Sequence, residues 1–178
     1  DKKFYEMNML RIDERFFDVF DFEFIHGSKD QPFNGIHSVV LTETTARKYF
    51  GDENPVGKII RTNINNSTDF EVSGVVTDVP GTSHFTFDVL VPFESGRNPD
   101  VDWEWYGFYT YARLKPGTDK EHFQTNVQNL FKKHQPNSLN EFYIQPLPDI
   151  HLSSNLKWEL SKNGDISYVN ILILIGVS

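Results

Sequence analysis

The sequence predicts an α+β fold built mainly from short strands. Three observations support this prediction. Short apolar or alternating runs recur between turn residues, two segments carry helical periodicity, and a strand–helix–strand order occupies the last third of the chain. The 178 residues suffice for one domain or two small subdomains, and a hydrophobic content of 38% with 16 Phe excludes a disordered segment.

Six strands are expected in the first half of the chain. The clearest alternation places Phe20, Phe22 and Phe24 on one side of a run and acidic residues on the other, which indicates a half-buried strand with an aromatic face. Stretches rich in Gly, Asn, Asp, Ser and Pro separate the runs and indicate turns. The expected strands are residues 4–12, 20–25, 38–41, 59–63, 70–76 and 85–91.

A helix is expected directly after the strand at residues 38–41. Thr42 is a typical N-cap, and Glu43 lies in the first turn, where the helix macrodipole favours an anion. Gly51 ends the pattern, since glycine readily takes the backbone conformation of a helix C-terminus. The apolar face consists of Ala46, Tyr49 and Phe50.

A second helix is expected in the last third of the chain. Thr118 and Glu121 form a capping box, in which the hydroxyl and the carboxylate each bond to a backbone N–H group. Apolar residues at helical spacing carry the helix to about His134, and basic residues suit its negative end. Strands on both sides, at residues 108–114 and 141–147, complete a β-α-β unit. The apolar face consists of Phe123, Val127, Leu130 and Phe131.

Two further segments bear on domain organisation. The polar stretch at residues 94–102 contains Gly96 and Pro99 and indicates a crossing between subdomains. Residues 171–177 are apolar apart from Gly176. A membrane-spanning helix needs about 20 such residues, so this segment fits the first turns of one or, equally well, a buried C-terminal strand.

Charge and cysteine content exclude several classes of protein. A net charge of −8 and a pI near 5.2 do not provide the basic surface that nucleic acids and anionic membranes require. The absence of cysteine excludes a disulfide scaffold, a thiolate metal site and a cysteine nucleophile. Residues 1–6 are charged and do not resemble a signal peptide, so we expect an exported domain to take its export signal from another part of its protein.

Two groups of residues are candidates for chemistry. Asp149 and His151 share one face if they lie on a strand, and a carboxylate–imidazole pair can act as an acid–base couple. No nucleophile accompanies them, so capping of the strand end is the favoured interpretation. Three acids at every second position can bind a hard cation, although a solvated face explains the same spacing and is favoured. These acids are Asp100, Asp102 and Glu104.

Motifs for other chemistry are absent from the sequence. The six His show no metal-ligand spacing, and neither a glycine-rich phosphate loop nor a GxSxG nucleophile elbow occurs. We therefore assign no catalytic, cofactor-binding or metal-binding residue and expect a binding or transmission module rather than an enzyme. An aromatic stripe is either a partner-binding surface or core, and core packing is favoured because large aromatics dominate core burial. The stripe consists of Phe16, Phe17, Phe20, Phe22 and Phe24.

Short motifs follow one another along almost the whole chain. Each is weak alone, but their order and spacing together are specific. They are Ile12-Asp13-x-x-Phe16-Phe17, Val19-Phe20-Asp21-Phe22, Ser38-Val39-Val40-Leu41-Thr42-Glu43, Tyr49-Phe50-Gly51, Asn54-Pro55-Val56-Gly57-Lys58, Phe70-Glu71-Val72-Ser73-Gly74-Val75-Val76-x-Asp78-Val79-Pro80, Ser83-His84-Phe85, Tyr109-Thr110-Tyr111-x-x-Leu114-Lys115-x-Gly117 and Gln145-Pro146-Leu147-x-Asp149-Ile150-His151-Leu152. In this order they resemble the MacB-like periplasmic core domain of MacB/FtsX-like ABC transporter permeases, in its Bacteroidetes-type form.

The resemblance implies a domain in two parts that lies between two transmembrane helices of a permease in the inner membrane of a Gram-negative bacterium. A mixed β-rich subdomain, residues 13–95, is then inserted into a ferredoxin-like subdomain of two β-α-β halves, and residues 107–165 form the second half. Residues 1–12 supply a strand from the N-terminal part, and residues 96–106 form the crossing. Residues 166–178 become the truncated start of a transmembrane helix, and most of the first half is expected to precede this sequence.

The resemblance also implies a mechanical, non-catalytic function. ATP hydrolysis in a cytoplasmic ATPase subunit moves the transmembrane helices, and the periplasmic domains of two permease subunits transmit that motion to export or signalling. A periplasmic adaptor or the exported substrate completes the expected partners, which include no nucleic acid and no cofactor. Trp103 and Trp105, near the crossing, mark a candidate hinge. The alternative is a stand-alone periplasmic adaptor or sensor module that binds a partner or a ligand.

Overall fold

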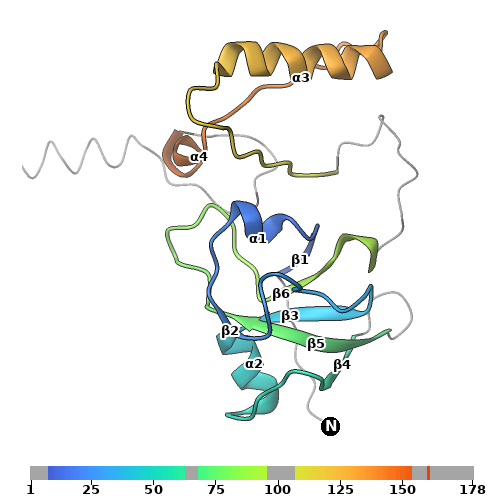
Figure 1. The fold of residues 1–178 in the computed structure, drawn as a ribbon, viewed down its shortest axis with the longest axis vertical. Coiled ribbons are helices and arrows are strands. Elements are labelled where there is room, and N and C mark those ends of the chain that lie inside the picture. Colours follow the sequence, from blue (N-terminus) through green and yellow to red (C-terminus); the bar gives the residue numbers. More distant parts are fainter. Residues whose placement is uncertain (1–7, 63–67, 96–106, 154–159, 161–178) are drawn as a thin grey trace, which may run out of the picture. The chain divides into compact units, whose positions relative to one another are not determined.

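The computed structural model describes residues 8–62, 68–95, 107–153 and 160 of the chain (Figure 1). The chain divides into two compact units, Asp1–Asn98 and Pro99–Ser178. In chain order the elements are β1 (Met9–Ile12), α1 (Phe16–Val19), β2 (Phe24–His26), β3 (Ser38–Thr42), α2 (Glu43–Phe50), β4 (Ile59–Thr62), β5 (Thr68–Val76), β6 (Val89–Pro92), η1 (Phe93–Ser95), α3 (Lys120–His134) and α4 (Leu147–Ser153).

The first unit contains one six-stranded mixed sheet with the order β1-β6-β3-β5-β2, in which β4 also pairs with β5. β3 is parallel to β5 and antiparallel to β6, and β1 is parallel to β6. β5 is nine residues long, and it pairs antiparallel with β4 along its first half and with β2 near its end. The mixed sheet confirms the predicted α+β class. It also includes β1, so residues 9–12 join the sheet formed by the residues that follow them.

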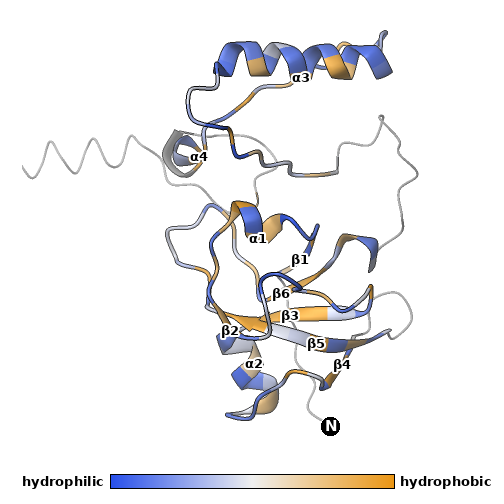
Figure 2. Ribbon diagram, viewed as in Figure 1, coloured by the Kyte–Doolittle hydropathy of each residue, from blue (hydrophilic) through white to orange (hydrophobic). Residues whose placement is uncertain are grey.

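Both faces of the central strands β3 and β6 are buried, which explains the unbroken apolar run of β3. On one face, Ala46 of α2 packs against side chains that alternate along the central strands, which Figure 2 shows as hydrophobic. Alternation places Val40, Val76 and Leu90 on the opposite face, where all three are fully buried. The face under α2 consists of Val39, Leu41, Phe70, Val72, Val75, Val89 and Val91.

An aromatic layer covers the second face of the sheet, where Figure 1 shows α1 on the side opposite to α2. The ring of Phe16 lies 4.9 Å from that of Phe20, and the ring of Phe17 lies 4.9 Å from that of Phe24. Phe17 and Phe87 are each 1% exposed. Of the predicted aromatic stripe, Phe17 is therefore part of the core, and the other four rings are half-buried and pack around it and around Phe85 and Phe87. The layer consists of Phe16, Phe17, Phe20, Phe22, Phe24, Phe85 and Phe87.

Two predicted strands are shorter than expected. Of residues 20–25, only the end belongs to β2, and of residues 85–91, only the part from Val89 belongs to β6. The alternating Phe side chains of both segments pack into the aromatic layer, so their burial pattern is satisfied without ladder hydrogen bonds. The predicted strand positions 4–7 and 63 lie outside the described residues.

The capping residue predicted for α3 is wrong by one position. Asp119, not Thr118, is the N-cap, and its carboxylate accepts hydrogen bonds from the N–H groups of Glu121 and His122, both at 3.0 Å. Thr118 donates instead to the carbonyl oxygen of Lys115 at 2.8 Å, which closes the preceding turn. An ionised carboxylate is a stronger acceptor than a hydroxyl, which explains why Asp119 takes the cap.

The second unit corrects the predicted β-α-β order. The helix is confirmed as α3, but residues 108–114 and 141–147 form no paired strand in the part of the chain that the structure describes. Alternating side chains produce a strand only where a neighbour supplies ladder hydrogen bonds, and no described segment of this unit does so. The last residue of the second run begins α4. Residues 171–177, predicted as the start of a membrane helix or a buried strand, lie outside the described part.

Candidate functional site

An open hollow of about 180 Å³ lies beside α2 in the first unit. Four apolar residues from β2, α2, β5 and the loop after α2 line it, together with four charged residues and His26. Pockets for small molecules usually enclose roughly 300–1,000 Å³, so this hollow has room for a single large side chain. The apolar residues are Ile25, Ala46, Pro55 and Val75, and the charged residues are Glu43, Arg47, Asp52 and Glu53.

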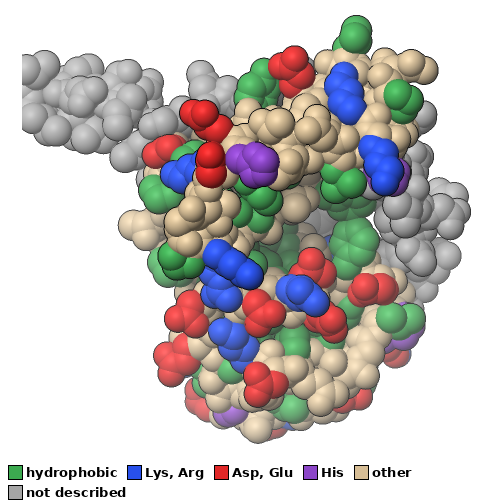
Figure 3. Space-filling view, turned by 45° about the horizontal axis from the view of Figure 1, so that its top comes forward, with side chains coloured by type: hydrophobic (Ala, Val, Ile, Leu, Met, Phe, Trp, Pro, Cys, Tyr) green, Lys and Arg blue, Asp and Glu red, His purple; other side chains and the backbone are tan. Residues whose placement is uncertain are grey.

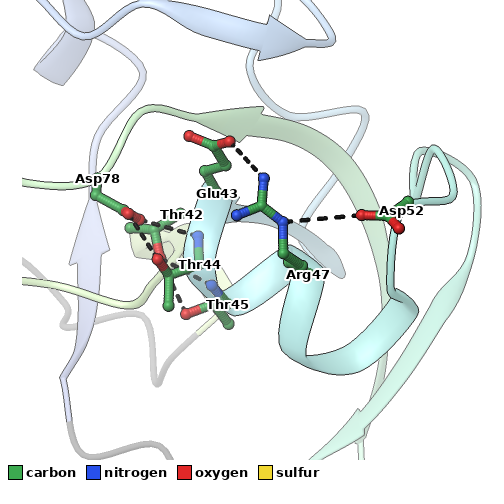
Figure 4. Close-up of polar contacts among 7 residues, drawn as sticks. All are labelled: Thr42, Glu43, Thr44, Thr45, Arg47, Asp52 and Asp78. Atoms are coloured by element: carbon green, nitrogen blue, oxygen red, sulfur yellow. Dashed lines mark hydrogen bonds and ion pairs between the residues drawn. The ribbon is translucent and has the colours of Figure 1, made fainter.

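The charged residues around the hollow are all engaged in ion pairs, and Figure 4 shows those of Arg47. The guanidinium of Arg47 lies 2.9 Å from the carboxylate of Glu43 and 3.9 Å from that of Asp52. Glu53 pairs with Lys58, whose hydrogen bond and positive charge hold the pKa of Glu53 below its usual value. Each acid around the hollow therefore has a basic partner.

Four polar residues fix the first turn of α2 (Figure 4). Thr42 caps the helix as predicted: its hydroxyl accepts a hydrogen bond from the N–H of Thr45 at 3.4 Å. Asp78, in the loop after β5, accepts from the N–H of Thr44 at 3.0 Å and from its hydroxyl at 2.6 Å. The carboxylate of Asp78 thus neutralises the positive end of α2. This contact ties the start of the helix to the loop that follows β5.

The strand expected to hold Asp149 and His151 is a helix. Asp149 and His151 both belong to α4, and positions two apart on a helix do not face one another. The alternative of capping a strand end fails for the same reason, since no strand ends there. The predicted cation ligands Asp100, Asp102 and Glu104, and the hinge candidates Trp103 and Trp105, lie outside the described residues.

The described residues outside the hollow meet the requirements of neither a metal site nor, on the face drawn in Figure 3, a nucleic-acid-binding surface. Across residues 8–62, 68–95 and 107–153, no three His, Asp or Glu residues come together in a way that could hold a metal ion. On the face drawn in Figure 3, acidic and basic side chains are interspersed. Such a face lacks the continuous basic surface that phosphate backbones require.

In the second unit, two glutamines of α3 hold the chain that follows the helix. Gln128 accepts a hydrogen bond from the N–H of Phe142 at 2.9 Å, and Gln124 accepts one from the N–H of Ile144 at 3.1 Å. The ring of Phe142 lies 4.6 Å from that of Phe131, the buried residue of α3. Amide groups two residues apart point to the same side, as in a strand, so residues 142–144 run along the helix in extended form.

The second unit also carries several exposed apolar side chains. Tyr111 is half-buried, and burial, with a smaller contribution from Tyr109, raises its pKa to about 12. Such groups mark a contact surface where they form one continuous patch. The exposed residues and their exposed fractions are Phe108 (42%), Tyr109 (51%), Leu130 (53%), Leu139 (94%), Phe142 (36%), Tyr143 (76%) and Leu147 (45%).

Sequence reasoning missed the residues that tie helices to their surroundings. The spacing of Gln124 and Gln128, four apart on a predicted helix, was a readable signal for one shared face. Asp78 offered no such signal. Only the parallel pairing of β3 with β5 brings the loop that follows β5 to the start of α2.

The family model of the MacB-like periplasmic core domain matches residues 3–130 of the chain. Two solved structures are similar. The first is described as a domain of a permease protein from Porphyromonas gingivalis, with 26% identity and a TM-score of 0.59 over 76% of this chain and 63% of that one. The second is the periplasmic region of MacB from Actinobacillus actinomycetemcomitans, with 21% identity and a TM-score of 0.50 over 72% of this chain and 56% of that one. No curated protein matches the chain.

The two solved structures support the α+β fold, and the family model shows which family the chain belongs to. The chain spans less than two thirds of the length of either structure. Among the helices of the described residues, none has both the length and the apolar character needed to cross a membrane. The match over residues 3–130 covers most of the sequence. The chain therefore belongs to the MacB-like periplasmic core domain family and is an extracytoplasmic domain.

Proposed function

We propose that this domain transmits ATP-driven motion of a permease to export or signalling in the periplasm and has no catalytic role. The single observation that carries the proposal is the family match over residues 3–130. The described site residues support it, because the polar groups around α2 are engaged in ion pairs and helix capping rather than aligned for a reaction. The match to a permease domain favours this function over a stand-alone adaptor or sensor.

A division into moving parts supports transmission. The sequence boundary of the two compact units falls between Asn98 and Pro99. It lies inside the segment at residues 96–106 that we propose as the crossing. We place the inserted β-rich subdomain at residues 13–95 and the ferredoxin-like part at residues 107–165, completed by strands from elsewhere in the permease. The exposed apolar side chains of the second unit support such a completion, because they offer a surface for further packing.

The proposed partners follow from the permease assignment. They are a second permease subunit, a cytoplasmic ATPase subunit that acts through the membrane part, and a periplasmic adaptor or the exported substrate. Residues 166–178 are proposed as the start of the next transmembrane helix. The proposed setting is the inner membrane of a Gram-negative bacterium, in a Bacteroidetes-type permease.

Spin labels on the full-length permease assembled with its ATPase test the proposal. The chain contains no cysteine, so a single cysteine in a cysteine-free permease labels one site in each subunit of the dimer. Asn129→Cys places the label on the exposed side of α3, and Lys48→Cys places it on the exposed side of α2. Pulsed electron paramagnetic resonance then measures the distance between the two labels of the dimer for each unit separately.

We expect the inter-label distance to differ between the ATP-bound and ADP-bound states at one site or both. A larger change at Asn129 than at Lys48 indicates that the second unit follows the membrane helices more closely. Identical distances in every nucleotide state at both sites, with ATP hydrolysis intact, refute the transmission of motion through this domain.

A further inference from the structure

The loop between β2 and β3 contains the pair Asn34–Gly35, and both residues are exposed. We propose that Asn34 is a site of spontaneous deamidation, in which the backbone nitrogen of Gly35 attacks the side-chain amide of Asn34 and water completes the reaction. The proposal rests on three features of the loop: the state of the attacking nitrogen, the space around it and the state of the amide.

The attacking nitrogen is available. Within the described residues, the N–H of Gly35 has no hydrogen-bond acceptor, whereas the groups on either side of it are held. The N–H of Asn34 donates to the hydroxyl of Ser38 at 3.0 Å, and the carbonyl oxygen of Gly35 accepts from the N–H of Ser38 at 3.1 Å. The nitrogen of Gly35 therefore has no hydrogen bond to break before it attacks, although its neighbours in the turn are bonded to Ser38.

The surroundings of the pair are open. Both residues are exposed, and a Cβ placed on Gly35 meets no heavy atom within 4 Å apart from its chain neighbours, so no other part of the unit crowds the attacking nitrogen. Among the described residues, the amide of Asn34 makes no hydrogen bond that would hold it away.

Two other asparagines of the same unit lack these features. Asn54 is followed by Pro55, whose nitrogen carries no hydrogen and cannot close the ring, and its side-chain oxygen accepts from the N–H of Val56 at 3.1 Å. The amide of Asn8 donates to the carboxylate of Asp88 at 3.0 Å. The structure thus separates Asn34 from both.

The reaction balances without any redox partner. The nitrogen of Gly35 bonds to Cγ of Asn34, the C–N bond of the amide breaks, and ammonia leaves with the proton from the Gly35 N–H. Water then opens the resulting succinimide at either carbonyl, which gives aspartate or isoaspartate. The net change is one amide and one water converted to one carboxylate and one ammonia, which adds a negative charge to the loop.

Isoaspartate also lengthens the backbone by one carbon in the turn that leads into β3. That strand pairs with both β5 and β6, and Ser38, which binds this turn, is 3% exposed. We therefore expect the deamidated chain to lose the Asn34–Ser38 hydrogen bond and to unfold at a lower denaturant concentration than the fresh chain.

Peptide mapping of the folded chain after incubation at mildly alkaline pH in heavy-oxygen water tests the proposal. We expect the peptide that contains Asn34 to show the mass change of deamidation, in which O replaces NH. The new oxygen comes from the solvent and is therefore heavy oxygen, while the masses of the peptides with Asn54 and Asn8 stay unchanged. Proteolysis separates this peptide from the second Asn–Gly pair of the sequence, Asn163–Gly164, which lies outside the described residues.

Gly35→Ala is the matched variant, because the open space at this position lets it fold. We expect it to slow the reaction by roughly tenfold or more, since a Cβ restricts the backbone freedom that ring closure uses. The proposal is overturned if Asn34 stays unmodified in the folded chain while the urea-unfolded chain deamidates there. It is also overturned if Gly35→Ala leaves the rate unchanged.

Discussion

Substitution of Gly27 by Ala tests how closely β2 approaches β5. Gly27 follows β2 with φ at +85°, and an added Cβ lies 2.5 Å from the carbonyl oxygen of Ser73 and 2.9 Å from the Cα of Gly74. Both are backbone atoms of β5, next to the register shift in its pairing with β3. A side-chain rotation cannot relieve this overlap, so one of the two strands has to move.

Two costs add in this variant. An L-residue in the left-handed region costs about 1–2 kcal/mol, and forcing an extra carbon into a packed site costs about 1–3 kcal/mol. The restricted unfolded chain returns about 0.4–1 kcal/mol. We therefore expect Gly27→Ala to lower the free energy of unfolding of the first unit by about 2–4 kcal/mol.

Two other glycines separate these costs. Gly57 has φ at +83° with no heavy atom near its Cβ position, so Gly57→Ala isolates the left-handed term, with an expected loss of about 1 kcal/mol. Gly35 has neither a positive φ nor a near neighbour, so Gly35→Ala is expected to be neutral or stabilising by about 0.5 kcal/mol.

Urea unfolding followed by circular dichroism measures the three variants. Hydrogen exchange of the β2 and β5 amides is added, because a chain of two units need not unfold in a single transition. Equal losses for Gly27→Ala and Gly57→Ala refute the close approach of β2 to β5. A loss of unfolding free energy for Gly35→Ala as large as for Gly27→Ala refutes the backbone conformations described for these glycines.

Three further predictions concern single side chains. Asp78→Ala removes both hydrogen bonds to Thr44 and is expected to lower the free energy of unfolding by about 1–2 kcal/mol. Urea titration measures this loss, and Thr44→Ala is the control because it removes only the hydrogen bond of the hydroxyl. Phe17→Ala empties a site that is 1% exposed and is expected to cost about 3–5 kcal/mol, whereas Leu139→Ala, at 94% exposure, is expected to change stability by no more than about 0.5 kcal/mol in the same assay. The raised pKa of Tyr111 means that the folded chain keeps this proton while the unfolded chain loses it above the usual tyrosine pKa of 10.0, so stability falls as pH rises from there towards about 12. A titration of tyrosinate absorbance in which Tyr111→Phe removes no late-titrating component contradicts the burial of this side chain.

Periodicity located most elements because it reports burial directly. The run at residues 38–41 is apolar throughout because β3 is covered on both faces, and the caps of α2 follow from the chemistry of Thr42 and Gly51. The same reasoning failed at residues 20–25, because alternation records which side chains are buried and not whether the backbone has a partner. An aromatic layer and a ladder give one and the same pattern.

Pairing between distant segments could not be predicted from the sequence. The parallel register of β3 with β5 depends on loops whose geometry the residue pattern does not encode, and Asp78 reaches α2 only through that register. Residues 141–147 carry a strand pattern, yet in the described unit the available bonds come from Gln124 and Gln128 of α3. The candidate couple Asp149 and His151 failed because α4 replaced the expected strand.

The polar side chains that the structure places most firmly all bind the backbone. Ser73 donates to the carbonyl oxygens of Pro32 at 2.6 Å and Val39 at 3.2 Å, and Asp78 and Asp119 accept from the first turns of α2 and α3. A catalytic group has to stay available to a substrate, whereas Ser73 and Asp78 join segments that lie far apart in the sequence and Asp119 caps its own helix. Such commitments stiffen a unit against deformation, and a stiff unit passes a displacement at one end to the other. This use of its polar groups agrees with the mechanical role proposed for the domain, which rests on the family match over residues 3–130.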